Sequence, residues 1–154
     1  MKAVLLRVGK GRTRWADDAV DDYARRFRKQ LAVEEIRVKP ATHRGDVQAT
    51  RDDEAKRLLA RLKSGDRLVA LDERGEIVTT EVFTGWIDAA ARAGVGRVVF
   101  AIGGPFGHGA AVRARADHVL AFGRMVVNHE LARILLVEQL YRASTLMWGG
   151  SYHH

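Results

Sequence analysis

Apolar and polar residues follow different periods along the chain, and these periods predict which segments are strands and which are helices. Short apolar or alternating runs predict strands at residues 3–8 (AVLLRV), 31–38, 67–71 (RLVAL), 97–102 (RVVFAI) and 118–122. Apolar residues three or four positions apart predict helices at residues 15–27, 47–63, 80–94, 110–116 and 130–147. Because strands and helices alternate without a linker, the sequence predicts one α/β domain over residues 1–154, with a parallel sheet covered on both faces.

Three segments that follow predicted strands are candidates for a binding site. They are residues 72–75 (DERG), expected to be a polar turn, residues 103–109 (GGPFGHG) and residues 123–129 (GRMVVNH). In open α/β sheets, ligands bind in the crevice beyond the carboxyl ends of the strands. We therefore expect these three loops to meet there. Two further local predictions are that Thr80 caps the third helix and that Trp15 shares an apolar helix face with Tyr23 and Phe27.

The glycine-rich segment 103–109 follows the most strand-like run of the chain. Its spacing, GG-x-x-G-x-G, differs from the G-x-G-x-x-G dinucleotide fingerprint, and the sequence has no G-x-x-x-x-G-K-[ST] phosphate loop. Two interpretations stay open at this point. The glycines are needed either for a tight turn with positive φ, or to let the backbone approach a ligand without an intervening Cβ.

Composition and charge narrow the class of protein. With 47% hydrophobic and 29% charged residues, the chain has the composition of a globular domain, and the absence of Cys excludes thiolate metal sites and cysteine nucleophiles. No signal peptide and no long apolar run is recognised, so we expect a cytoplasmic protein that contacts no membrane. Nearly all of the net charge of +7 lies in residues 1–51. This asymmetry indicates either an anionic macromolecular partner or an ordinary solvated basic face.

Four sequence segments together resemble one known family. These are LDERG at 71–75, IGGPFG at 102–107, AFGRMVVNHELARILLVEQLYRA at 121–143 and the terminal SYHH. The chain resembles, over its full length, the SPOUT-class methyltransferases that modify N3 of a pseudouridine in bacterial 23S rRNA. The resemblance implies an α/β fold with a C-terminal trefoil knot, a homodimer, an assembled ribosome as substrate, no metal, and S-adenosylmethionine as cofactor.

The resemblance also implies roles for individual residues. Family cofactor contacts map onto Leu71, Gly103, Gly104, Gly123, Arg124, Met125, Val126 and Val127. The catalytic candidates are His129, Arg142, Tyr152 and His153. Separately from the resemblance, the basic N-terminal third predicts RNA binding by Lys10, Arg12, Arg14, Arg25 and Arg26, with ordinary solvation or a place at the dimer interface as the alternatives.

The catalytic candidates also have simpler interpretations. His129 is either a participant in proton transfer or a helix-entry residue that makes one hydrogen bond. Arg142 is four residues after Glu138, the spacing of an intrahelical ion pair, and Tyr152 and His153 lie where chain ends commonly fray. The sequence departs from the family pattern at Phe106, usually polar, at Asn128, usually proline, and at His154, usually Lys or Arg.

Two other functions fit the same residues. One is a noncatalytic basic RNA-binding module that has kept the fold. The other is a SPOUT methyltransferase that acts on a different RNA, such as tRNA.

Overall fold

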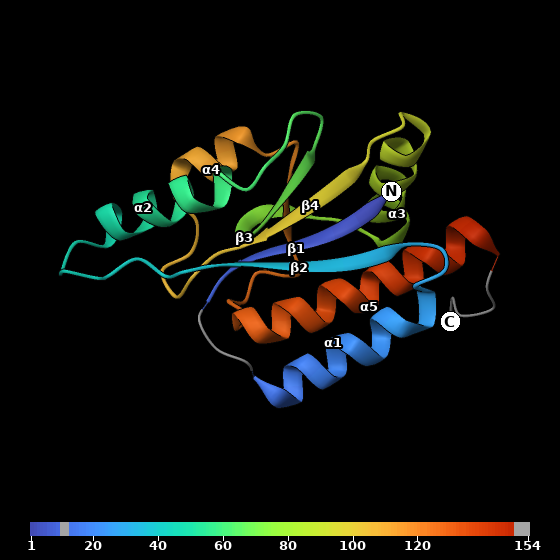
Figure 1. The fold of residues 1–154 in the computed structure, drawn as a ribbon, viewed down its shortest axis with the longest axis horizontal. Helices are drawn as coiled ribbons and strands as arrows, with labels where there is room; N and C mark the ends of the chain where they lie inside the picture. The colour runs from blue at the N-terminus through green and yellow to red at the C-terminus, as the bar shows by residue number, and fades with distance from the viewer. Residues whose placement is uncertain (10–12, 150–154) are drawn as a thin grey trace.

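A computed structural model describes residues 1–9 and 13–149, and its strands and helices alternate as the sequence predicts (Figure 1). The strands are β1 (Lys2–Val8), β2 (Ala32–Val38), β3 (Arg67–Ile77), β4 (Arg97–Ile102) and β5 (His118–Ala121). The helices are α1 (Arg14–Phe27), α2 (Val47–Leu59), α3 (Thr80–Arg92), α4 (Ala110–Arg115) and α5 (His129–Trp148).

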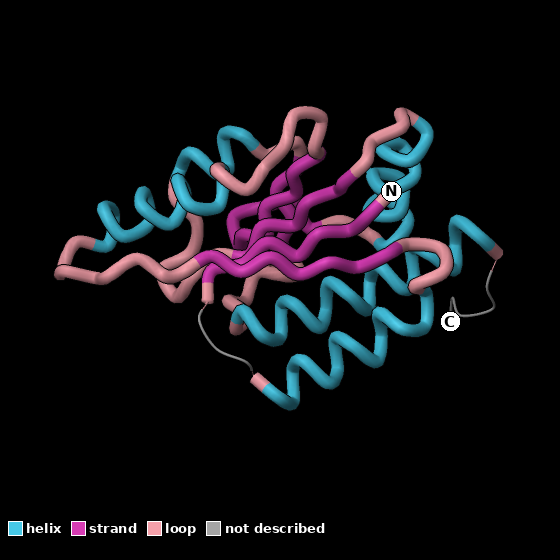
Figure 2. The backbone as a smooth tube through the Cα atoms, in the orientation of Figure 1, coloured by secondary structure: helices cyan, strands magenta, loops and turns pink. Residues whose placement is uncertain are grey.

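The strands form one parallel sheet in the order β2-β1-β4-β3-β5. Helices cover both faces of this sheet, with α1 and α5 side by side on one face and α2 with α4 on the other (Figures 1 and 2). The predicted α/β class with a parallel sheet is therefore confirmed. The trefoil knot stays a prediction. None of the described helices is long and apolar enough to span a membrane.

The alternating side chains of the sheet build a separate core on each face. Ala3 and Leu5 of β1 pack into the larger core, to which α1, α3 and α5 contribute Val20, Phe27, Phe83, Ile87, Leu136, Val137 and Leu140. Val4 and Leu6 face the other way and pack into the smaller core with Ala55, Leu58 and Val112 of α2 and α4. Both faces of the sheet are therefore covered by an apolar core, which explains why the strands are near-continuous apolar runs.

The predicted turn at residues 72–75 is wrong, because β3 continues through it to Ile77. β3 pairs with β5 twice, first at Leu71 with Leu120 and again at Glu76 with the same residue, and the register shifts between the two. Gly75 makes this possible, since a Cβ there would lie 2.5 Å from the carbonyl oxygen of Val119. Residues 72–75 thus form an irregular stretch within β3, and the residues on either side of them are held by pairing with β5.

Three smaller predictions about the helices are also wrong: the cap of α3, the end of α2 and the burial of Trp15 on α1. The cap of α3 is Thr79 rather than Thr80, and its hydroxyl accepts the backbone N–H of Val82 at 3.3 Å. Helix α2 ends at Leu59, four residues earlier than expected. Trp15 is 55% exposed and does not share the buried face of α1.

Candidate active site

A cavity of about 680 Å³ lies beyond the carboxyl ends of β3, β4 and β5. Its wall is formed by the ends of these strands and by the segments that follow β4 and β5, as the sequence predicts. The predicted cofactor residues on this wall are Leu71, Gly103, Gly104, Gly123, Met125, Val126 and Val127. Arg124 is exposed and is not among the lining residues. A volume of this size matches the pockets that hold cofactors and other small ligands.

The glycine loop after β4 is a tight turn with positive φ, which confirms the first of the two interpretations; it also lines the cavity, and close approach to a ligand stays a prediction. The backbone N–H of Gly107 donates to the carbonyl of Gly104 at 2.9 Å, and Gly107 has φ of +78°. A Cβ on Gly104 would lie 2.7 Å from Oε2 of Glu54, a buried α2 residue. Gly104 is therefore needed for close packing onto α2.

Helix α2 also holds the tip of this loop. Arg51 Nε donates to the carbonyl oxygen of Phe106 at 2.6 Å, and the Phe106 ring packs on His43 with ring centroids 4.7 Å apart. Phe106, one of the departures from the family pattern, thus has a local partner in this chain. Neither Arg51 nor Glu54 was predicted as part of the site.

The segment between β5 and α5 forms the opposite wall. Met125 and Val126 are 84% and 82% exposed, which is unusual for large apolar residues. Asn128, the second departure, is the N-cap of α5, and its side chain accepts the backbone N–H of Glu130 at 2.8 Å. The cap fixes the start of the helix and with it His129, which lines the cavity.

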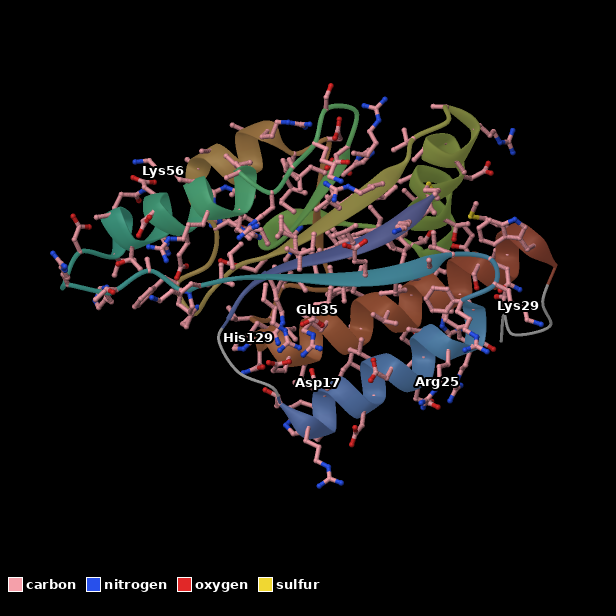
Figure 3. The ribbon with its side chains drawn as sticks, in the orientation of Figure 1. Asp17, Arg25, Lys29, Glu35, Lys56 and His129 are labelled. Carbon is pink, nitrogen blue, oxygen red and sulfur yellow. The ribbon has the colours of Figure 1, made fainter. Side chains whose placement is uncertain are left out.

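A largely buried ion cluster lies at this end of the sheet, on the face that α1 and α5 cover. It comprises Arg7 of β1, Asp17 of α1, Glu35 of β2, Glu130 and Arg133 of α5 and, at its exposed edge, Arg37 of β2. In Figure 3, Asp17, Glu35 and His129 lie close together between the sheet and the two helices. Three arginines face three carboxylates, so the cluster is formally neutral. Charges buried in this way are tolerated only when they are paired and hydrogen-bonded.

Arg133 is the centre of this cluster. Its side chain is 1% exposed, and its guanidinium contacts Asp17 and Glu35 at 2.8 Å each and also Glu130. Burial alone would raise the pKa of Glu35, but hydrogen bonds from Arg7 and Arg37 and the charge of Arg133 together lower it. The carboxylate therefore stays ionised in the folded protein.

The cluster reaches the cavity through Glu130. Its Oε1 accepts a hydrogen bond from the Thr13 hydroxyl at 3.0 Å and lies 3.5 Å from Nε2 of His129. The His129 side chain is 36% exposed, so it contacts both the cluster and the solvent-accessible cavity. His129 thus lies between the ion cluster and the cavity.

Asp72 is a second buried carboxylate at the site. Its side chain is 1% exposed and lies 2.8 Å from Arg74 and 3.3 Å from Arg113. Burial alone would raise its pKa, but hydrogen bonds from the Arg74 side chain and backbone and the charges of both arginines lower the pKa to about 2. Asp72 is therefore an ionised carboxylate whose negative charge is balanced by Arg74 and Arg113.

We predict that Asp72→Asn lowers the free energy of unfolding by about 1–2 kcal/mol at neutral pH. Because the folded pKa is below the unfolded value of 3.8, the stabilisation is complete above that value and is lost as pH falls through about 2. Urea unfolding of wild type and variant across this range should show the difference shrinking as pH falls. Asp88→Asn, on an exposed pair, is the control, and a difference that persists at low pH would contradict a charge-based role.

The remaining predicted residues do not converge on the cavity. Arg142 forms an ion pair with Glu138 at 2.5 Å. Arg142 is thirteen residues after His129, which places it roughly 20 Å from His129 along α5. Arg14, Arg25 and Arg26 are on α1, and Figure 3 shows Arg25 at the far end of that helix from His129. Lys10, Arg12, Tyr152, His153 and His154 lie outside the described residues.

Within residues 1–9 and 13–149, no three His, Asp or Glu side chains are grouped so that they would hold a metal ion. A wider basin of about 1120 Å³ lies at the opposite, amino end of the strands. Its charged residues are largely paired with one another, as in Arg97 with Asp66 and Arg67 with Asp117. The cavity at the carboxyl ends is therefore the better candidate site.

The fold is a parallel α/β domain with a cavity between glycine-containing loops at the strand ends. Residues 1–153 match the family described as "Predicted SPOUT methyltransferase". The chain belongs to the SPOUT methyltransferase family.

Two similar proteins match this chain along essentially their full lengths. One from Geotalea uraniireducens is 37% identical over 154 residues, which are 100% of both chains. One from Geobacter metallireducens is 36% identical and covers 100% of this chain and 99% of its own. Both are called ribosomal RNA large subunit methyltransferase H.

Among solved structures, the SpoU methyltransferase AviRb from Streptomyces viridochromogenes, in complex with AdoMet, has a TM-score of 0.45 and 15% identity. The match covers 97% of this chain and 61% of that one. This similarity is too low to support a conclusion about function.

Proposed function

We propose that the protein transfers a methyl group from S-adenosylmethionine to N3 of a pseudouridine in 23S rRNA of the assembled ribosome, in the cytoplasm. The observation that carries the proposal is the cavity, at which the three predicted strand-end segments meet in a chain of the SPOUT methyltransferase family. The full-length similarity to proteins called ribosomal RNA large subunit methyltransferase H supports the choice of RNA.

The cavity fits the cofactor in size and in the character of its wall. Leu71, Ile102 and Phe122 give it apolar surface, and the glycines expose backbone groups. A Cβ on Gly123 would meet no protein atom within 4 Å, so this position opens onto free space. We assign the adenosyl and methionyl groups to Leu71, Gly103, Gly104 and the segment 123–127, with Arg124 at its exposed edge.

The protein's task is to position the acceptor and to remove its proton. S-adenosylmethionine supplies a methyl group on a sulfonium, which is its own leaving group. N3 of a pseudouridine lies between two carbonyls and carries a proton that must be lost before attack. His129, on the cavity wall and 3.5 Å from Glu130, is the described residue best placed to accept that proton. Glu130 would then face the positive charge that forms on the imidazole.

The site is completed by a second copy of the chain. Leu131 and Leu135, four residues apart on α5, are 48% and 40% exposed, and Met125 and Val126, which precede this helix, are also exposed apolar residues. An exposed apolar patch of this kind is typical of a subunit interface. We assign Arg142, Tyr152 and His153 of the second copy to the acceptor side of the site, with stacking on the nucleobase as the role of Tyr152.

The basic residues of α1 bind the RNA backbone. Arg14 and Arg25 are exposed, with side chains 96% and 67% accessible, and Arg26 lies 4.8 Å from the Tyr23 ring centroid. Their ion pairs with Asp18 and Asp22 are exposed and therefore weak, so a phosphate can replace the carboxylate. Lys10 and Arg12 extend the same basic segment in sequence.

The proposal is tested by incubating the protein with labelled S-adenosylmethionine and ribosomes that lack the modification. We expect label in 23S rRNA at N3 of a pseudouridine, located by nuclease digestion and mass spectrometry. Free rRNA and tRNA are the comparison substrates. Transfer to tRNA alone would favour the other methyltransferase function, and ribosome binding without cofactor binding would favour the noncatalytic module.

We predict that deleting residues 152–154 leaves the dissociation constant for S-adenosylmethionine within about twofold, because the cavity wall is formed by residues 51–132. Transfer to ribosomes should fall on the order of 100-fold, since general acid–base and positioning groups contribute that much. Calorimetry and single-turnover transfer measure the two effects. His154→Ala, which keeps Tyr152 and His153, is the control, and full turnover by the deletion would remove the chain end from the site.

A further inference from the structure

We propose that Arg51 is the anchor for the carboxylate of the cofactor's methionyl group, an inference that rests on the proposed function. Arg51 is on the second turn of α2, outside the three segments that the sequence predicts as the site. It nevertheless lines the cavity, and it is the only Lys or Arg among the described residues that do. A ligand that carries a carboxylate thus meets one cationic side chain in this wall.

The guanidinium of Arg51 is held in place before any ligand arrives. Its Nε donates to the Phe106 carbonyl at 2.6 Å, and Phe106 is fixed by its packing on His43. The other two nitrogens of Arg51 have no hydrogen-bond or ion-pair partner among the described residues. A guanidinium anchored by one nitrogen keeps a planar pair of donors, the geometry that suits a carboxylate.

The acidic residues of the cavity do not neutralise Arg51. Asp72 pairs with Arg74 and Arg113, and Glu73 lies 3.9 Å from Arg74 on the exposed side. The positive charge of Arg51 is therefore left for the ligand. S-adenosylmethionine carries one anionic group, its carboxylate, and this is the group that Arg51 binds.

The test compares two ligands that differ only in that carboxylate. Calorimetry gives the dissociation constants of S-adenosylmethionine and decarboxylated S-adenosylmethionine for wild type and Arg51→Gln. The glutamine keeps an N–H donor for the Phe106 carbonyl but has no charge. Arg44→Gln is the matched control, because it removes the same charge from an exposed residue outside the cavity.

We expect wild type and Arg44→Gln to bind S-adenosylmethionine roughly 10-fold or more tightly than the decarboxylated ligand, as expected for a charged hydrogen bond. Arg51→Gln should lose that preference while its affinity for the decarboxylated ligand stays unchanged. Equal weakening of both ligands would overturn the inference, because Arg51 would then act only on the loop.

Two further outcomes would also overturn the inference. Unchanged affinities together with a higher, salt-sensitive KM for ribosomes would assign Arg51 to an RNA phosphate instead. Binding of neither ligand by wild type would contradict the proposed function itself, and the inference with it.

Discussion

Replacing Arg133 with methionine should lower the free energy of unfolding by about 3–5 kcal/mol, the loss expected when one partner of a buried ion pair is removed. Arg133 contacts Asp17, Glu35 and Glu130 and is 1% exposed. Without it, three carboxylates remain between the sheet and the two helices with only Arg7 and Arg37 to balance them. Urea unfolding at neutral pH measures the effect.

The same variant should have a characteristic pH dependence. The lowered pKa of Glu35 stabilises the fold above the ordinary carboxyl pKa, and this contribution is lost as pH falls through the folded value. The difference between Arg133→Met and wild type should therefore shrink in acid. Arg92→Met, which breaks an exposed pair with Asp88, should change stability by less than about 0.5 kcal/mol. An Arg133→Met protein as stable as wild type would show that the cluster does not hold the fold together.

Gly104→Ala should weaken binding of S-adenosylmethionine roughly 10-fold or more, because a displaced loop loses hydrogen bonds and contacts to the ligand that are each worth about 1 kcal/mol. The affinity falls because the loop is displaced, not because the new methyl group occupies the cavity. The added Cβ would lie 2.7 Å from Glu54 Oε2, and Glu54 is buried and accepts the backbone N–H of Ala41, so we expect the loop rather than this side chain to shift. A direct block of the cavity by the side chain is not required. Calorimetry of the purified variant measures the affinity.

A second substitution separates this explanation from simple blocking. Glu54→Ala in the Gly104→Ala background removes the colliding carboxylate and should restore much of the affinity. Gly85→Ala, at a helical position where a Cβ meets no atom within 4 Å, should leave affinity unchanged. If the double variant binds no better than Gly104→Ala, the added methyl group acts inside the cavity.

The sequence predicts the sheet and the meeting of the three segments because both follow from the period of apolar residues and from the geometry of parallel strands. It does not predict the full length of β3. Residues 72–75 carry turn-like chemistry, and β3 continues past them because Leu71 and Glu76, on either side, both pair with β5, more than forty residues later. Long-range pairing of this kind leaves no local pattern.

The charged residues of the site were missed for a different reason. Arg51 and Glu54 are on a helix rich in charged residues, and periodicity alone does not decide which of them face inward. Arg7 did give a signal, since an arginine within the apolar run AVLLRV of a two-sided sheet must find carboxylates. Its partners come from three other elements, so the sequence indicates that they are needed but does not identify them.

A crystal structure of the protein with S-adenosylmethionine tests the central claim most directly. We expect density for the adenosyl group among Leu71, Gly103, Gly104 and Gly123, with His129 facing the donor carbon. Density in the basin at the amino ends of the strands, or strand-end segments that close the cavity when cofactor is present in excess, would contradict it.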